Sequence, residues 1–151
     1  MNNKELEKLK ELLYCEDSEE IKKEVKHINN SILLHIFAAN YNWDNGFEIP
    51  NIIINNEHCD LGTALMMFYS VDGYRLLENQ TNVFSSQMTD WKEFISNLYH
   101  KIKNNKFKKQ EISFTPQLSK VQIYKLKKNN PNIPDVFLNK SPGKEIEIPV
   151  L

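Results

Sequence analysis

Apolar residues recur at intervals of three and four along much of this chain, the spacing that places them on one face of an α-helix. Near the amino terminus Leu6, Leu9 and Leu13 form such a stripe. The same pattern predicts helices over residues 3–13, 18–28, 31–42, 50–54, 60–70 and 90–102. The chain is therefore expected to be mainly α-helical.

Capping residues locate the starts of several of these helices. Ser18 is expected to cap the second helix, and Asp60 the helix that follows residue 60. Asp90, with Glu93 three residues later, has the spacing of a capping box and is expected to open the last helix. A break after residue 70 is predicted at Asp72, which a glycine follows.

Two of the predicted helices define the core. The helix over residues 31–42 is apolar on almost every side, so it is expected to lie at the centre. The helix over residues 90–102 carries a single stripe that includes Trp91, Phe94 and Leu98. We expect this stripe to pack on the central helices as part of one core.

Beyond Lys103 the helical pattern ends. Weak alternation around residues 112–114 and 121–123, together with prolines at 131, 134, 142 and 149, predicts an extended or short-stranded segment. The prediction is a mainly α, compact multi-helix domain of packed helical hairpins with an extended or short-stranded C-terminal extension. A single domain, 1–151, is expected, with an N-terminal helical hairpin at residues 1–30 and a helical core at residues 31–103. An extension that is first lysine-rich and then punctuated by prolines follows at residues 104–151.

Charge is unevenly distributed along the chain of 151 residues, although the formal net charge is only −1. Residues 31–95 carry eight acidic and two basic side chains, a formal charge of −6. Residues 101–128 carry nine lysines and one glutamate. Such segregation bears on partners and encounter rates. The charged start of the chain resembles no signal peptide and no apolar run would span a membrane, so a cytoplasmic protein without a membrane partner is expected.

Few residues suggest catalysis. His58, Cys59 and Asp60 are adjacent, but neighbouring residues rarely converge on one metal ion, and Cys15 is the only other cysteine. No nucleotide-binding glycine motif is present. We therefore predict no metal, no cofactor and no catalytic residue. The alternative is a hydrolase that uses Cys59, with His58 or His35 as its base, and nearby carboxylates.

Lysines between residues 101 and 109, interleaved with Phe107, suggest a second alternative, a nucleic-acid-binding adaptor, and the later segment from Tyr124 to Lys128 adds to this basic region. The chain is not basic overall, and Arg75 is its single arginine, the residue type most used to contact base edges. The composition therefore argues against nucleic acid as the partner.

Residues 33–77 contain the runs HIFAANYNWDNGFEIP, CDLGTALMMFY and DGYRLL. This block resembles the bacterial domain-of-unknown-function family 4274. The resemblance implies a compact helical domain and carries no catalytic residue with it. Its family-defining positions would be Trp43, Asp44, Gly46, Pro50, Cys59, Asp60, Gly62 and Asp72.

Small bacterial domains of this kind are similar in size to immunity proteins encoded beside polymorphic or contact-dependent toxins. We therefore expect a cytoplasmic protein-binding module that neutralises a cognate toxin domain, possibly a nuclease, by direct binding. An acidic surface would speed the encounter with a basic toxin. The residues predicted to bind the partner lie in loops between apolar helices and comprise Asp44, Glu48, Glu57, Trp43 and Phe47.

Overall fold

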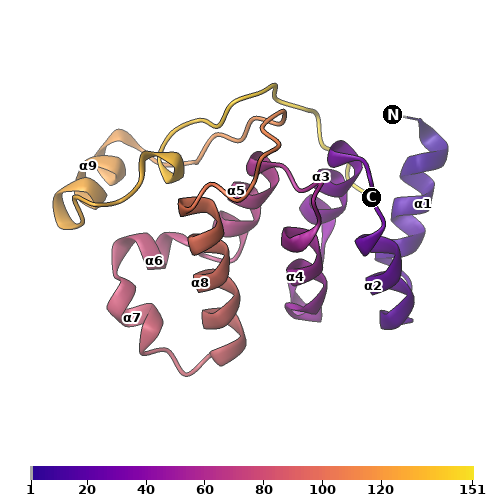
Figure 1. The fold of residues 1–151 in the computed structure, drawn as a ribbon, viewed down its shortest axis with the longest axis horizontal. Helices are drawn as coiled ribbons and strands as arrows, with labels where there is room; N and C mark the ends of the chain where they lie inside the picture. The colour runs from indigo at the N-terminus through magenta and orange to yellow at the C-terminus, as the bar shows by residue number, and fades with distance from the viewer. Residues whose placement is uncertain (1) are drawn as a thin grey trace.

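The computed structural model describes residues 2–151 and is mainly helical, as the sequence predicts (Figure 1). Within this range the helices are α1 (Asn3–Leu13), α2 (Ser18–Lys26), α3 (Ser31–Asn40), α4 (Glu48–Asn55), α5 (Leu61–Ser70), α6 (Tyr74–Glu78), α7 (Gln80–Phe84), α8 (Thr89–Lys103) and α9 (Lys120–Asn129). Two short 3-10 helices are η1 (Trp43–Asn45) and η2 (Asp135–Phe137).

The first five helices form two rows. In one row α1 contacts α3, and α3 contacts α5; in the other α2 contacts α4. Stacking of successive helical pairs side by side is the architecture of helical repeat proteins. The stack continues through α8, which packs on α5, and through α6, which contacts α9. As a result, α1 and α2 lie at one end of the molecule and α9 lies at the other (Figure 1).

The core runs through the centre of this stack. Five consecutive residues of α3 are buried, and together they face every side of the helix, so α3 is central, as its all-round apolarity predicts; they are Leu34, His35, Ile36, Phe37 and Ala38. Phe94 and Leu98 of α8 are also buried, and α8 packs on α5. The prediction that the apolar stripe of α8 packs with the central helices in one core is therefore confirmed.

Several predicted helix ends are wrong. The helix predicted over residues 18–28 ends at Lys26, and the helix predicted over residues 50–54 begins at Glu48. Asp17, not Ser18, caps α2, because its carboxylate accepts hydrogen bonds from the backbone N–H groups of residues 19 and 20. The helix predicted over residues 31–42 ends at Asn40, because Tyr41 has an extended backbone. Asp90 does not cap α8: the helix begins one residue earlier, at Thr89, and Met88 offers it no side-chain cap. Asp90 instead lies in the first turn.

More of the chain is helical than the pattern indicates. The short helices α6 and α7 occupy a segment expected to be a loop. In the extension, residues 121–123 belong to α9 and not to a strand. A capping box between Ser119 and Gln122 starts α9, and Leu126 anchors it in the core. The weak alternation of apolar and polar residues therefore predicted the two-residue period of a strand, whereas the segment is a helix.

The rest of the extension lies extended along the helical body (Figure 1). The carboxylate of Asp60, the cap of α5, accepts hydrogen bonds from the backbone N–H groups of Gly62, at 2.8 Å, and Glu111, at 2.7 Å. A parallel bridge joins Ile112 to Lys144. Asp60 thus fastens the start of the extension to the body.

The end of the chain is fastened by Asn40. Its side-chain amide donates to the carbonyl of Pro149 at 2.9 Å and accepts the N–H of Leu151 at 3.0 Å. The extension therefore runs the length of the stack, from α9 to the α1–α3 region. None of the helices described in residues 2–151 is long and apolar enough to cross a membrane.

Candidate functional site

The two aromatic residues predicted to bind a partner lie in the connection between α3 and α4. Trp43, in η1, and Phe47, just before α4, are both half-buried. Their rings lie 5.8 Å and 5.2 Å from the ring of Phe94 in α8. The ring of Tyr41 meets Trp43 edge-on at 5.4 Å. The side chains of Tyr41, Trp43 and Phe47 thus form the outer layer of the core and stay partly exposed to solvent.

The three predicted acidic residues do not lie together. Asp44 and Glu48 are exposed beside this aromatic layer. Glu57 is also exposed, but it follows the other end of α4, an eight-residue helix that spans about 12 Å. There it lies 3.4 Å from the ring of His58. The three acidic residues predicted to bind a partner therefore lie in two separate places.

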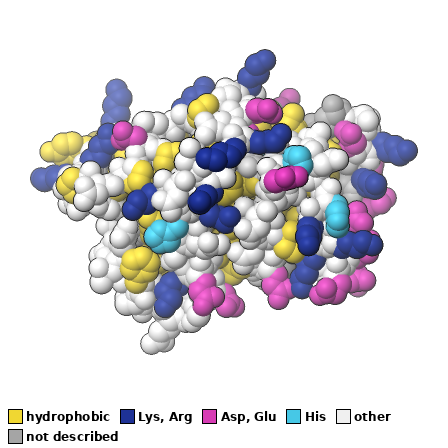
Figure 2. All heavy atoms as spheres, viewed as in Figure 1, with side chains coloured by type: hydrophobic (Ala, Val, Ile, Leu, Met, Phe, Trp, Pro, Cys, Tyr) yellow, Lys and Arg dark blue, Asp and Glu magenta, His cyan; other side chains and the backbone are white. Residues whose placement is uncertain are grey.

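Further carboxylates surround Phe47. A groove of about 400 Å³ between α4 and α8 is lined by Glu48, Asp90 and Glu93. A second groove of about 540 Å³ adjoins it, because Phe47 and Asp90 line both, and it adds Asp72. We call the four exposed carboxylates around Phe47 the acidic face: Glu48, Asp72, Asp90 and Glu93. Acidic side chains gather along the lower edge of the molecule, whereas lysines predominate above and toward α9 (Figure 2).

Cations compensate this face only in part. Arg75 lies 3.9 Å from the carboxylate of Asp72, and its guanidinium stacks 4.9 Å above the ring of Trp91. Lys22 reaches Glu48 at 2.5 Å, and this hydrogen bond raises the pKa of the lysine. Exposed ion pairs of this kind are weak and compete with solvent. The face therefore keeps an excess of negative charge.

Apolar groups lie within the acidic face. Met88 is 53% exposed, although it is a large apolar side chain. Trp91 is held in place beside it, since its Nε1 donates a hydrogen bond to the carbonyl of Val71 at 2.7 Å. Fixed aromatic and methionine side chains surrounded by charge are typical of protein-binding surfaces.

Sequence reasoning missed Asp72, Asp90 and Glu93 as parts of this surface. The excess of acids in residues 31–95 was the available signal. Asp72 and Asp90 were instead assigned to a turn and to a helix cap. Only the packed structure brings Asp90 and Glu93 into one groove with Glu48, and Asp72 into the adjoining groove with Asp90.

The residues of the hydrolase alternative are poorly suited to catalysis. Cys59 is 2% exposed, and burial raises the pKa of its thiol, the reverse of an activated nucleophile. His35 is 3% exposed and burial lowers its pKa to about 4, while its Nδ1 lies 2.8 Å from the hydroxyl of Thr63. These groups are core residues. Over residues 2–151, no three His, Cys, Asp or Glu side chains are grouped to hold a metal ion.

The aromatic residue within the lysine stretch 101–109 is not open to a nucleic acid, whereas Tyr124 of α9 is 65% exposed. Phe107 is 4% exposed and packs in the core, with Lys101 5.9 Å from its ring centre. Bases stack on aromatic rings that are open to solvent. Phe107 therefore offers no such platform to a nucleic acid.

The fold and the surface define a small helical protein whose histidine and cysteine of greatest catalytic interest are buried and whose acidic face is open. Residues 29–103 match the family model described as Domain of unknown function (DUF4274). The resemblance noted for residues 33–77 is thereby confirmed and extended through α8. Searches among curated proteins and among solved structures return no match.

Proposed function

We propose that this protein is a protein-binding module, an immunity protein that neutralises a cognate bacterial toxin by covering part of its surface. The observation that carries the proposal is the acidic face, in which four exposed carboxylates surround Phe47, Met88 and Trp91. The apolar groups would supply buried contact area. The carboxylates would attract a basic partner.

The charge distribution favours a basic toxin surface, such as the phosphate-binding cleft of a nuclease. Complementary charges raise association rates and disfavour partners of the wrong sign, and both effects weaken as salt increases. Because η1 and the start of α4 are packed against α8, the face is preorganised and binding would cost little ordering of the chain.

Co-expression with the neighbouring open reading frame tests the proposal first. We expect the two proteins to copurify, and we expect this protein to rescue growth when the neighbour is toxic. Failure to copurify, together with failure to rescue growth from a demonstrably toxic neighbour, would contradict the proposal.

Charge reversal then tests the surface. Glu48→Lys with Asp90→Lys should slow association with the copurified partner by about tenfold or more at low salt. Glu57→Lys reverses a single carboxylate at the far end of α4, outside the face, and should leave the rate within about twofold. An equal effect of both changes would place binding outside the acidic face.

A further inference from the structure

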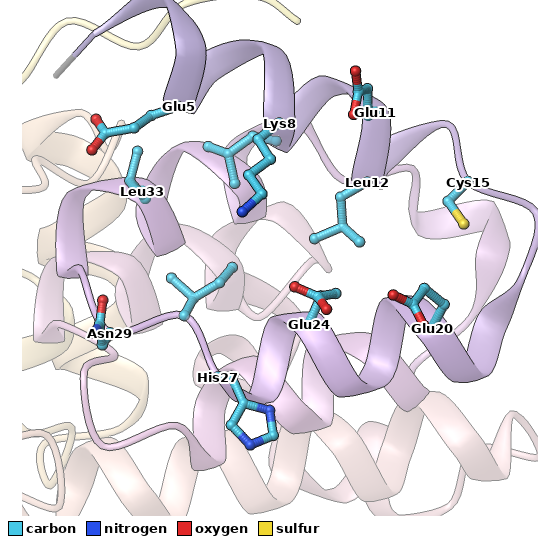
Figure 3. A pocket seen from close by; sticks show the side chains of 12 residues that line it. Glu5, Lys8, Glu11, Leu12, Cys15, Glu20, Glu24, His27, Asn29 and Leu33 are labelled. Carbon is cyan, nitrogen blue, oxygen red and sulfur yellow. The ribbon is translucent and has the colours of Figure 1, made fainter.

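A separate groove lies between α1 and α2, at the end of the stack opposite α9 (Figures 1 and 3). It encloses about 570 Å³. Four glutamates line it, against one lysine, Lys8, and one histidine, His27. We call it the α1–α2 groove; its apolar lining is Leu9, Leu12, Ile28 and Leu33, and its glutamates are Glu5, Glu11, Glu20 and Glu24.

Three of these carboxylates have no partner of their own. Glu5 closes the capping box of α1 by accepting the N–H of Asn2. Within residues 2–151, Glu11, Glu20 and Glu24 form neither an ion pair nor a side-chain hydrogen bond, although Figure 3 shows Glu20 and Glu24 rising from α2 toward α1. The groove therefore combines an apolar lining with an excess of negative charge.

The far end of the molecule presents the complementary surface. On α9, Val121 is 60% exposed and Tyr124 is 65% exposed, whereas Leu126 is buried. Lys125 and Lys128 follow Val121 by four and seven positions, so they share its helical face. This exposed stripe of α9 is apolar and basic, and neither lysine forms an ion pair within the described residues.

We propose that α9 of a second copy of this chain docks in the α1–α2 groove. Val121 and Tyr124 would cover the apolar lining, while Lys125 and Lys128 would meet Glu20 and Glu24. The lengths agree, because the ten residues of α9 span about 15 Å and the nine of α2 span about 13 Å.

This association joins two different surfaces at opposite ends of the molecule, so it is head to tail. Such contacts build rings where the rotation closes and open chains where it does not. A single helix in a groove buries less area than a standard interface, so the affinity is expected to be weak, with a Kd on the order of 100 µM.

Sedimentation velocity of the purified full chain tests the association. Between about 10 µM and about 1 mM at low salt, the weight-average sedimentation coefficient should rise, and the rise should shrink at about 0.5 M salt. A coefficient that stays at the monomer value up to the highest concentration overturns the proposal.

A charge exchange identifies the two surfaces. Glu20→Lys with Glu24→Lys should abolish self-association, and so should Lys125→Glu with Lys128→Glu. An equimolar mixture of the two variants should associate again, because each reversed surface then meets a complementary one. Association that survives in either variant alone, or a mixture that remains monomeric, overturns the proposal.

Lys106→Glu with Lys108→Glu provides the matched control. These lysines are exposed in the loop after α8, and the change alters the net charge by the same amount as the α9 variant. Self-association should remain within about twofold of the native chain if the effect depends on the α9 surface and not on net charge. Loss of association in this control as well would overturn the assignment to α9.

Discussion

Truncation of Phe94 is the most direct test of how the core supports the acidic face. Phe94 is 1% exposed, and its ring lies 5.2 Å from Phe47 and 5.8 Å from Trp43. These rings link α8 to the α3–α4 connection. Phe94→Ala removes the ring that both of them contact.

The expected loss follows from two contributions. Removing the ring gives up roughly 100 Å² of buried apolar area, about 2.5 kcal/mol at about 25 cal/mol per Å². The remaining cavity and the two lost aromatic contacts add about 1–2 kcal/mol. We therefore expect the free energy of unfolding to fall by about 3–5 kcal/mol, the usual range for a buried aromatic side chain.

Urea unfolding followed by circular dichroism measures this change. Phe84→Ala is the matched control, because Phe84 lies on α7 and is 50% exposed, so its loss should cost less than about 1 kcal/mol. A loss below about 1 kcal/mol for Phe94→Ala would show that α8 is peripheral to the core.

Three further tests address buried groups. Burial lowers the pKa of His35 to about 4, whereas the imidazole of the unfolded chain takes up a proton near pH 6.5. The contribution of this difference to the free energy of unfolding is fully present above about pH 6.5 and is lost as the pH falls toward 4. His35→Gln should reduce the difference in unfolding free energy between pH 7.5 and 4.5 by about 2 kcal/mol, and an unchanged difference would exclude His35 as the cause. Gly62→Ala should lower the melting temperature by several degrees, because a Cβ there would lie 1.9 Å from the carbonyl oxygen of Ile112, and an unchanged melting temperature would contradict this packing. In the native protein a thiol reagent should modify Cys15 well before the buried Cys59, and Cys59→Ala should leave any partner binding intact; loss of function in a folded Cys59→Ala protein would favour the hydrolase alternative.

The sequence predicts the fold best where the local pattern of apolar residues coincides with the residues that are buried. The all-round apolarity of α3 and the stripe of α8 each identify core helices, because hydrophobic burial selects the period of the pattern. Asp60 was correctly assigned as the cap of α5. Its second role, the hydrogen bond to the N–H of Glu111, depends on a segment 51 residues away and has no local signal.

The errors have a similar origin. Along α9 only Leu126 is buried, so the segment shows little helical periodicity, and its capping box was the better indicator. At α8, Asp90 satisfied the sequence rule for a cap, yet Met88 occupies that position. The acidic face has no local signal either, because it assembles Asp90 and Glu93 of α8 with Asp72, a residue that precedes α6.

Local structure explains some of these carboxylates better than others. Glu48 and Asp90 lie in the first turns of α4 and α8, where the helix dipole favours negative charge. Asp72 has a φ of 65°, a conformation that aspartate tolerates more readily than most residues. Each of the three therefore has a structural reason to be present.

Glu93 has no comparable reason. It is exposed, lies beyond the first turn of α8 and follows Asp90 by three positions, where like charges destabilise a helix slightly. Glu93→Gln should therefore leave the free energy of unfolding unchanged or raise it by about 0.2–0.5 kcal/mol. If the acidic face binds a basic partner, the same change should slow association at low salt. An association rate equal to that of the native chain would mean that Glu93 lies outside the contact surface, and the proposal would then depend on the carboxylates that helix structure already explains.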